Sequence, residues 1–224
     1  MEEWVAANLA PDSYFFTWIV DPTVIIGRNQ DIDSEVNLDY CRRHGIEVVR
    51  RRSGGGCVYA DRDNIMMSYV CADTEVESTF ARYTGLVASQ LRAMGIDARP
   101  SGRNDITVGN DRKISGNAYY KLPDRSIVHG TMLFDTDFDH MLNAITPSRA
   151  KLESHGVKSV ASRITTVRQI MPEMEMDDFH RRLVEGLETG RRELTADEIA
   201  AIEVLEQAYY DPEWLYGTTK NNHT

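Results

Sequence analysis

Segments rich in aromatic and β-branched residues, separated by polar turns, follow one another through the first 134 residues of the chain. Residues 14–20 and 23–26 flank Asp21 and Pro22 and predict a hairpin or two neighbouring strands. Residues 65–71 are a short apolar run after a polar turn, which predicts a buried strand. Further strands are predicted at residues 46–49, 57–59, 105–108, 112–115 and 126–134.

Helical periodicity is clearest in residues 78–94, where the apolar side chains fall on one face. There Ser78 can cap the helix and Gly95 can end it. Another helix is predicted at residues 34–44, closed by Gly45. Because strands come before helices rather than strictly alternating with them, the pattern favours an α+β fold with mixed or antiparallel sheets flanked by helices. The later helices are predicted at residues 138–145, 177–187 and 196–208.

Composition narrows the class of protein. The 224 residues are 42% hydrophobic and 27% charged, as in an ordinary globular protein of one large domain or one domain with a small appendage. The net charge of −10 argues against nucleic-acid binding, which needs a basic face. Three cysteines without a Cys-x-x-Cys pair fit a reducing compartment. No apolar run approaches the ~20 residues of a membrane span and the start is acidic, so we expect a cytoplasmic protein with no membrane partner.

Three arginines run directly into Ser53 and three glycines at residues 50–56. Glycine permits positive φ and carries no Cβ, so successive N–H groups can converge on phosphate or carboxylate oxygens. The arginines would add permanently charged donors beside them. The alternative is a flexible, solvated loop, but the predicted strands on both sides favour an anion-binding turn. In an acidic protein the anion is expected to be small.

Two further elements carry candidate chemistry. A hairpin is predicted with Asn104 and Asp105 at one end and Lys113 just past its turn. Lys113 could meet the anion held by the glycine loop, although an exposed lysine without a role is the alternative. His129 lies within a predicted strand, where a core or surface histidine without a catalytic role is again the alternative.

These segments together resemble the lipoate–protein ligase family of the biotin/lipoate ligase superfamily. The resemblance extends over residues 14–170 and follows the family's order of elements. The elements that carry it are residues 22–30 (Pro-Thr-Val-Ile-Ile-Gly-Arg-Asn-Gln), residues 50–56 (Arg-Arg-Arg-Ser-Gly-Gly-Gly), Arg103-Asn104-Asp105, Lys113-Ile114-Ser115-Gly116, His129-Gly130-Thr131 and residues 156–165 (Gly-Val-Lys-Ser-Val-Ala-Ser-Arg-Ile-Thr).

The resemblance implies a two-step reaction in which ATP and lipoate give lipoyl-adenylate, and the lipoyl group then passes to a lysine of a lipoyl-domain protein. The implied acceptors are the E2 subunits of 2-oxoacid dehydrogenases and the H protein of glycine cleavage. A separate accessory subunit is a further implied partner. The implied cofactors are ATP and Mg²⁺, with lipoate as substrate.

The resemblance also implies roles for individual residues. Lys113 would be the catalytic residue, and Asp105 with Asn104 would organise Mg²⁺ and phosphate. Arg51 and the amides of the glycine loop would hold the acyl carboxyl and the adenylate phosphate, while His129 would line the lipoyl side of the pocket. The full set of substrate- and adenylate-binding residues implied is Arg51, Ser53, Gly54, Gly55, Gly56, Val58, Asn104, Asp105, Ser115, Gly116, His129 and Thr131.

Departures from the family pattern keep alternatives open. Ala60 and Asp63 stand where the family usually has histidine and glycine, and Glu2-Glu3 alone matches a longer N-terminal segment. One alternative is an ATP-independent octanoyl or lipoyl transferase with an acyl-cysteine intermediate, for which Cys57 and Cys71 are the candidates. Another is a non-catalytic lipoyl-binding relative. A biotin ligase is disfavoured because its Gly-Arg-Gly-Arg-x-Gly signature is missing.

We expect residues 1–190 to form the catalytic domain and residues 191–217 a helical extension or linker. Residues 218–224 are expected to be a disordered tail. Residues 214–217 (Trp-Leu-Tyr-Gly) resemble the linker that leads to an accessory domain in two-domain ligases, and we expect no such domain here.

Overall fold

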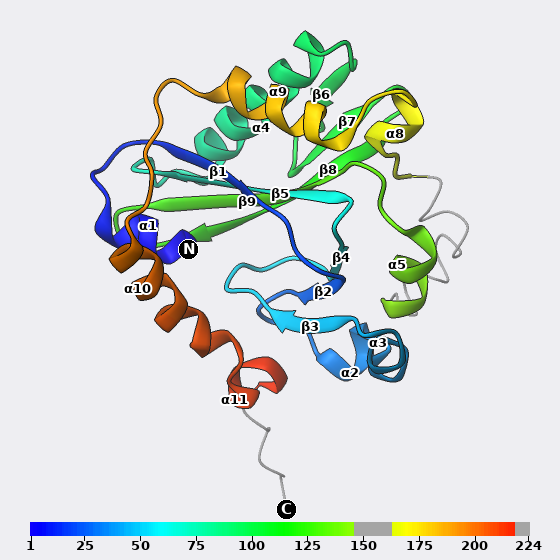
Figure 1. The fold of residues 1–224 in the computed structure, drawn as a ribbon, viewed down its shortest axis with the longest axis vertical. Helices are drawn as coiled ribbons and strands as arrows, with labels where there is room; N and C mark the ends of the chain where they lie inside the picture. The colour runs from blue at the N-terminus through cyan, green and yellow to red at the C-terminus, as the bar shows by residue number, and fades with distance from the viewer. Residues whose placement is uncertain (146–162, 218–224) are drawn as a thin grey trace, which may run out of the picture.

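Two β-sheets organise the part of the chain that the computed structural model describes, residues 1–145 and 163–217 (Figure 1). The larger sheet has the strand order β1-β5-β9-β8-β7-β6, with every neighbouring pair antiparallel. The smaller sheet has the order β3-β2-β4, with β2 parallel to β3 and antiparallel to β4. The strands are β1 (Tyr14–Trp18), β2 (Thr23–Ile26), β3 (Glu47–Arg50), β4 (Val58–Ala60), β5 (Asn64–Cys71), β6 (Ala98–Pro100), β7 (Asp105–Val108), β8 (Arg112–Lys121) and β9 (Ser126–Leu133).

Helices cover the two sheets from different sides. In Figure 1, α4 and α9 lie over one face of the larger sheet, and the smaller sheet lies beyond the other face, with α3 and α5 beside it. A second group of helices, α10, η1 and α11, runs along the left of the molecule to end near β3. The helices are α1 (Glu2–Asn8), α2 (Ile32–Glu35), α3 (Leu38–His44), α4 (Val76–Ala93), α5 (Phe138–Ala144), α8 (Val167–Ile170), α9 (Met176–Leu187), α10 (Ala196–Glu206), η1 (Gln207–Tyr209) and α11 (Pro212–Tyr216).

The central strand and the longest helix follow from the hydrophobic pattern. All eight residues of β5 are buried, because its two faces meet apolar side chains from opposite directions. Helix α4 buries Tyr83, Val87 and Leu91 against the larger sheet, and Gly95 follows it at φ +94°. The predicted buried strand and the predicted helix with one apolar face are both confirmed. The expected cap is wrong, however: α4 begins at Val76, and the Ser78 hydroxyl donates to Asp73 instead.

The expected pairing of residues 14–20 with residues 23–26 is also wrong. Both segments are strands, but β1 pairs with β5 in the larger sheet, whereas β2 pairs with β3 and β4 in the smaller one. The intervening Asp21–Pro22 segment therefore passes between sheets and does not form a hairpin.

The helix expected at residues 34–44 is divided into α2 and α3. Val36 is extended, at φ −127° and ψ 133°, because it bridges to Ile145. Asn37 then caps α3, since its Oδ1 accepts a hydrogen bond from the N–H of Tyr40 at 3.0 Å. Gly45 ends α3 in the left-handed conformation, at φ 64°, as predicted.

The α+β class with mixed and antiparallel sheets is confirmed, while short elements at α1, β6, α8 and α11 were not foreseen. The expected tail at residues 218–224 and most of the 156–165 signature lie outside the described residues. The division into a catalytic unit and an extension at residue 190 stays a prediction. Among the described helices, none combines the length and the apolar character that crossing a membrane requires.

Candidate functional site

The glycine loop, defined here as Ser53 to Gly56, joins β3 to β4 at the end of the smaller sheet. Its position is fixed by close packing against the residue that follows β2: a Cβ on Gly27 would lie 2.1 Å from the carbonyl oxygen of Gly55. The Ser53 carbonyl also accepts a hydrogen bond from the N–H of Arg28 at 2.9 Å. Gly54, Gly55 and Gly56 are exposed, and the described residues supply no acceptor for their amide groups. Those amides are therefore free to bind an anion.

Arg51 is folded into the glycine loop rather than extended from it. Its Nη2 donates to the carbonyls of Gly54 at 2.7 Å and Gly56 at 2.8 Å, and its Nη1 donates to Ile25 at 3.1 Å. Its Nε donates to the Ser53 hydroxyl at 2.9 Å. By taking up the loop's carbonyls on the inner side, Arg51 shapes the loop.

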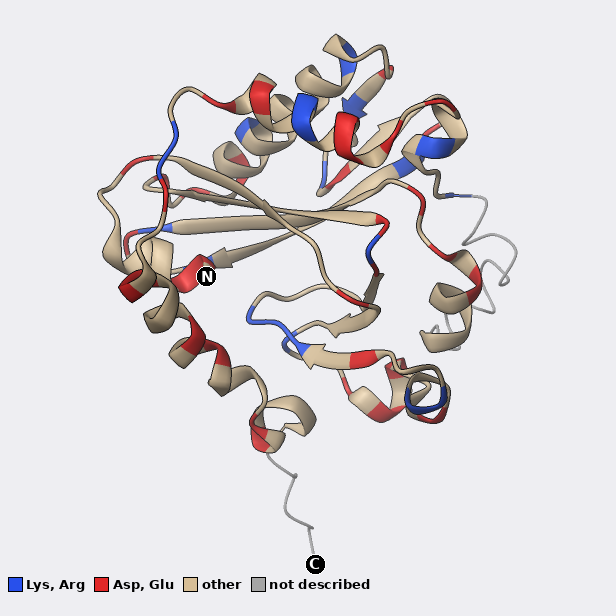
Figure 2. Cartoon of the chain, viewed as in Figure 1, with Lys and Arg blue, Asp and Glu red and all other residues tan. Residues whose placement is uncertain are grey.

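The two flanking arginines are also engaged. Arg50 is buried and donates to the carbonyl of Leu215 at 2.9 Å and to three carbonyls of residues 27–30. The Arg52 guanidinium stacks on the Trp214 ring, 3.9 Å from its centroid. In Figure 2 these basic residues form a blue stretch where β3 enters the loop, whereas the charged residues of α10 are all acidic. Each of the three guanidinium groups is therefore in contact with other groups of the protein.

A chain of hydrogen bonds connects the glycine loop to the N-terminal helix across the sheet. The Ser53 hydroxyl lies 2.6 Å from Nε2 of His129, and Nδ1 of His129 lies 3.0 Å from the Glu2 carboxylate. The Ser68 hydroxyl donates to the same carboxylate at 2.5 Å and accepts from the Trp18 indole at 3.0 Å. Both ring nitrogens of His129 are thus occupied.

The hydrogen-bond partners of His129 set the direction of the hydrogen bonds that its ring makes. Burial raises the pKa of the Glu2 carboxyl, but the His129 charge and the hydrogen bonds from His129 and Ser68 outweigh it, so the pKa lies below its usual 4.5. The ionised carboxylate can only accept, so Nδ1 of His129 donates to it. Ser53 accepts from Arg51 and therefore donates to Nε2 when the imidazole is neutral.

Lys113 forms an ion pair with Asp105, in which Nζ lies 2.9 Å from Oδ1. A register shift between β7 and β8 places Ile106 opposite Ser115 and Thr107 opposite Lys113, so β8 has one extra residue at this point. The Lys113 side chain then runs over Gly116, where a Cβ would lie 2.4 Å from its Cε and Nζ. The Lys113 backbone is held by Arg163 and Thr165, at 2.7 and 2.9 Å.

The sheet register brings Lys113 to the same face as His129. Gly116 pairs with Thr131, and paired residues point to the same side of a sheet, so the amine above Gly116 shares the face of Thr131. His129 is two residues from Thr131 on β9, a separation of about 7 Å on that face. The glycine loop reaches this face through the contact between Ser53 and His129. The predicted loop, lysine, aspartate and histidine therefore meet on one face.

Two of the predicted residues, Ser115 and Asn104, have side chains that are engaged away from this face. Ser115 and Asn117 point to the opposite face, where their partners are Met132 and Gly130. The Asn104 side chain donates to the carbonyl of Asn117 at 2.8 Å, and the Asn117 side chain donates back to that of Asn104 at 2.7 Å. Ser115 and Asn104 thus support the strand that carries Lys113, and their side chains do not join the glycine loop.

An apolar lining lies between the two sheets beside these polar groups. Ile25, Ala60 and Met66 form a buried cluster, with Trp18 packed at its side. Val58 pairs with Ile25 on the same face, and the Thr131 hydroxyl contacts the sulfur of Met66 at 3.4 Å. Ala60, one of the departures from the family pattern, is completely buried in this cluster.

The cysteines lack the properties of a nucleophile. Burial, together with the charge of Glu35, raises the pKa of Cys57 to about 12. Burial also raises the pKa of Cys71, which lies three residues beyond Ser68 in the core under α4. Since the thiolate is the reactive form, both environments oppose an acyl-cysteine intermediate.

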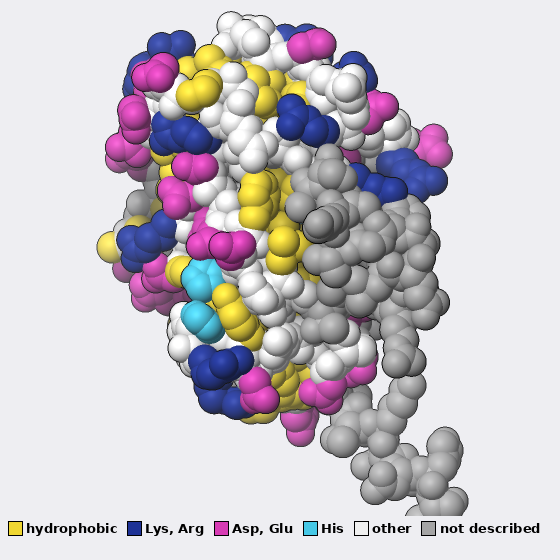
Figure 3. Space-filling view, turned by 90° about the vertical axis from the view of Figure 1, so that its right-hand side faces the viewer, with side chains coloured by type: hydrophobic (Ala, Val, Ile, Leu, Met, Phe, Trp, Pro, Cys, Tyr) yellow, Lys and Arg dark blue, Asp and Glu magenta, His cyan; other side chains and the backbone are white. Residues whose placement is uncertain are grey.

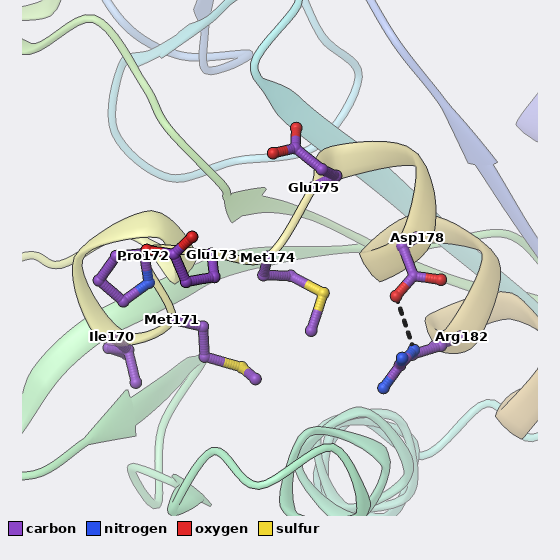
Figure 4. Close-up of a pocket in the computed structure, with 8 residues that line it drawn as sticks. All are labelled: Ile170, Met171, Pro172, Glu173, Met174, Glu175, Asp178 and Arg182. Atoms are coloured by element: carbon purple, nitrogen blue, oxygen red, sulfur yellow. Dashed lines mark ion pairs between the residues drawn. The ribbon is translucent and has the colours of Figure 1, made fainter.

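Other surface features contain none of the predicted residues. A hollow of about 600 Å³ at the start of α9 is lined by Met171 and Met174 and edged by an Asp178–Arg182 ion pair (Figure 4). Figure 3 shows one face of the molecule, on which histidine, apolar and charged side chains lie side by side. The rings of His44 and His140 lie with their centroids 5.3 Å apart. Within residues 1–145 and 163–217, no three His, Cys, Asp or Glu side chains are arranged to hold a metal ion.

Several residues that build the site carried no assigned role in the sequence. Glu2 was visible only as half of an acidic pair, and nothing local indicated its contact with His129, 127 residues away. Asn117 follows the Lys-x-Ser-Gly element directly, but its position in the sequence indicated no role of its own. Gly130 makes room for Asn117, because a Cβ there would lie 1.8 Å from its Oδ1.

Comparison with known proteins gives concordant matches. The family model of the lipoyl protein ligase A/B catalytic domain matches residues 1–188. Lipoate–protein ligase 1 of Staphylococcus aureus is 37% identical over 225 residues, which cover 97% of this chain and 68% of that protein. A lipoate–protein ligase of Bacillus subtilis is 34% identical over 97% of this chain and 69% of its own length.

Solved structures share the fold. A bi-partite lipoate protein ligase of Thermoplasma acidophilum, studied with its E2 lipoyl domain, matches with a TM-score of 0.86 at 27% identity, over 100% of this chain and 92% of that one. A lipoate–protein ligase A bound with ATP matches with a TM-score of 0.82 at 26% identity, over 96% of this chain and 91% of that one. A putative lipoate protein ligase of T. acidophilum with bound lipoic acid gives the same values.

Proposed function

The chain belongs to the lipoyl protein ligase A/B catalytic-domain family, and from that membership we propose that it activates lipoate with ATP and transfers the lipoyl group to a lysine of a lipoyl-domain protein. It is an enzyme of the lipoate–protein ligase kind. The names of solved relatives support ATP and lipoate as substrates, since one binds ATP and another lipoic acid.

The observation that carries the proposal is the meeting of two anion-binding elements on one face of the larger sheet. One is the glycine loop with its exposed amides, and the other is the Lys113–Asp105 pair. In the first step a lipoate oxygen attacks the α-phosphorus of ATP and pyrophosphate leaves. Because both reactants are anions, the site must offset their charge and align them. The loop amides and the Lys113 ammonium supply that charge from fixed positions.

Each residue has a definite task in this proposal. Asp105 holds the Lys113 amine over Gly116 before substrate arrives, and the amine then lies between the acyl carboxyl and the α-phosphate. Arg51 keeps the loop carbonyls turned inward, which leaves the amides outward. In the second step the neutral acceptor lysine attacks the acyl carbon, AMP leaves, and the amine loses its proton.

The lipoyl chain is proposed to lie along the apolar lining of Ile25, Met66, Val58 and Trp18. His129, with both nitrogens engaged, would line the lipoyl side of the site and support Ser53.

One observation supports Asp105 as a ligand of a magnesium ion. Oδ1 of Asp105 is buried and accepts no hydrogen bond from the described residues, although the Lys113 Nζ lies 2.9 Å away in an ion pair. Mg²⁺ in phosphate sites takes one or two carboxylates and completes its shell with phosphate oxygens and water. When bound, it would neutralise phosphate charge; Asp105 is the residue proposed to hold it.

The acceptors are proposed to be lipoyl domains of 2-oxoacid dehydrogenase E2 subunits and the glycine cleavage H protein. The T. acidophilum ligase studied with its E2 lipoyl domain supports the first of these, and its bi-partite description supports a separate accessory subunit. We propose residues 1–190 as the catalytic unit and residues 191–217 as an extension. A reducing location, the cytoplasm, is proposed on the free thiols of Cys41, Cys57 and Cys71.

Lipoate-dependent exchange of labelled pyrophosphate into ATP tests the first step. We expect exchange in the wild type, a loss of about 10²–10³-fold in Lys113→Ala, and no change in Cys57→Ser. Acyl transfer from a carrier protein without ATP, lost in Cys57→Ser, would instead establish the cysteine transferase. Tight lipoyl-adenylate binding without transfer to any lipoyl domain would identify a non-catalytic relative.

A further inference from the structure

The C-terminal arm, defined here as residues 207–217, reaches back to the strand that leads into the glycine loop. Helix α11 contacts β3, which is an edge strand of the smaller sheet because it pairs only with β2. The Trp214 indole N–H donates to the carbonyl of Arg50 at 2.9 Å, on that open edge. In return, Nε of Arg50 donates to the carbonyl of Leu215 at 2.9 Å. The arm is therefore joined to β3 by two reciprocal hydrogen bonds.

Trp214 also holds the residue next to the loop. Arg52 precedes Ser53, and its guanidinium lies 3.9 Å from the Trp214 ring centroid and 5.3 Å from that of Tyr209. Its Nε is buried without a hydrogen bond among the described residues, and it lies 3.7 Å from the Glu3 carboxylate. Stacking on the indole and the ion pair with Glu3 thus hold this guanidinium together, and such stacking gains strength when the cation is desolvated.

A second path leads from the arm to the loop through Arg50. The same guanidinium that bonds Leu215 donates through Nη1 to Gly27, Arg28 and Gln30, at 3.1, 3.1 and 2.7 Å. That segment supports the glycine loop, through the Arg28 amide and the close approach of Gly27 to Gly55. Strand β3 ends at Arg50, and Arg50 and Arg52, both held by the arm, immediately precede and follow Arg51, whose guanidinium enters the loop's interior.

We propose that Trp214 is a positioning residue of the activation step: by fixing Arg50 and Arg52 it holds the glycine loop in the conformation that presents its amides. This inference rests on the proposed function. It assigns no contact between Trp214 and substrate. The attachment of the arm to β3 therefore affects how tightly the loop binds ATP and lipoate.

The test compares Trp214→Ala and Trp214→Phe with Glu213→Ala, a change on the exposed side of the same helix. Hydrogen–deuterium exchange of the Arg51 and Arg28 amides, which donate to the carbonyls of Ile26 and Ser53, reports how the loop is held without requiring activity. In Trp214→Ala we expect it to be at least tenfold faster, with β5 and β9 unchanged, and Glu213→Ala to match the wild type. Phenylalanine can stack on Arg52 but cannot donate to Arg50, so Trp214→Phe should recover part of the protection.

Pyrophosphate exchange gives the functional readout. We expect the KM for ATP to rise at least fivefold in Trp214→Ala, with a smaller change in kcat. If the wild type is active but hydrogen–deuterium exchange of the loop is unchanged in Trp214→Ala, the role of Trp214 is wrong and the proposed function stands. Equal acceleration in β5 and β9 would overturn that role as well, because that pattern marks general destabilisation. If the wild type shows no lipoate-dependent pyrophosphate exchange, both the proposed function and the role of Trp214 are wrong.

Discussion

Gly116 lies directly beneath the Lys113 side chain, and a Cβ at Gly116 would fall 2.4 Å from both Cε and Nζ of that lysine. The two residues are only three apart, and the extra residue of β8 between them allows the lysine side chain to run along its own strand toward Gly116. The absence of a side chain at residue 116 therefore decides where the amine lies.

Gly116→Ala should displace the amine without unfolding the sheet. Because a preorganised charge typically contributes about 3 kcal/mol to transition-state stabilisation, we expect pyrophosphate exchange to fall about 10²-fold. The matched control is Gly85→Ala in α4, where an added Cβ meets nothing within 4 Å. That control should keep its activity and gain about 0.5–1 kcal/mol of stability. Equal activity of Gly116→Ala and wild type would show that the lysine position is not required.

The Glu2–His129 contact should make stability depend on acid pH. The pKa of Glu2 is below 4.5 in the folded protein, so its ionised form stabilises the fold above the unfolded pKa and this contribution is lost as pH falls through the folded pKa. We expect Glu2→Gln to lower the free energy of unfolding by about 1.5–3 kcal/mol at pH 6.5. Urea denaturation at several pH values should show this difference shrinking below pH 4.5. A difference that grows toward acid pH would contradict the sign of the shift.

Cys57 should react slowly with alkylating reagents. With a pKa of about 12, its thiolate fraction at pH 8 is about 10⁻⁴. We expect iodoacetamide modification of Cys57, followed by peptide mass spectrometry, to be at least a hundredfold slower than that of a free small thiol at pH 8. Rapid modification at pH 7, together with loss of activity, would return the cysteine transferase to consideration.

Tyr83 carries a buried hydroxyl that has no hydrogen-bond partner among the described residues. Leaving such a group unsatisfied costs about 1–3 kcal/mol, so Tyr83→Phe should match the wild type or be more stable by about 1 kcal/mol in urea denaturation. Tyr69→Phe is the control, because the Tyr69 hydroxyl donates to Ser13 at 3.0 Å and its loss should destabilise. A loss of more than 1 kcal/mol in Tyr83→Phe would indicate an ordered water at that hydroxyl.

The sequence predicted which segments are buried and on which face. An uninterrupted apolar run predicts a strand covered on both faces, as residues 65–71 are, and the 3.6-residue periodicity of residues 78–94 predicts the face that α4 buries. Gly45 could be assigned to a left-handed position because glycine occupies that conformation without steric cost. The order of the short elements also indicated the family, since each has a distinct composition.

Partners distant in the chain were decided only by the tertiary structure. The period of the hydrophobic pattern indicates which face of a segment is buried, but it does not indicate which other segment covers that face. For this reason β1 was expected beside β2, although it pairs with β5. Arginine's charge suggested a free guanidinium at residue 51, whereas the folded loop offers its carbonyls to that group. Likewise, the amino-acid types at residues 2 and 129 allow a contact, but only the docking of α1 on the sheet brings the carboxylate to the imidazole. Residue type thus set the available chemistry, and the packing of remote segments decided which groups remain free to use it.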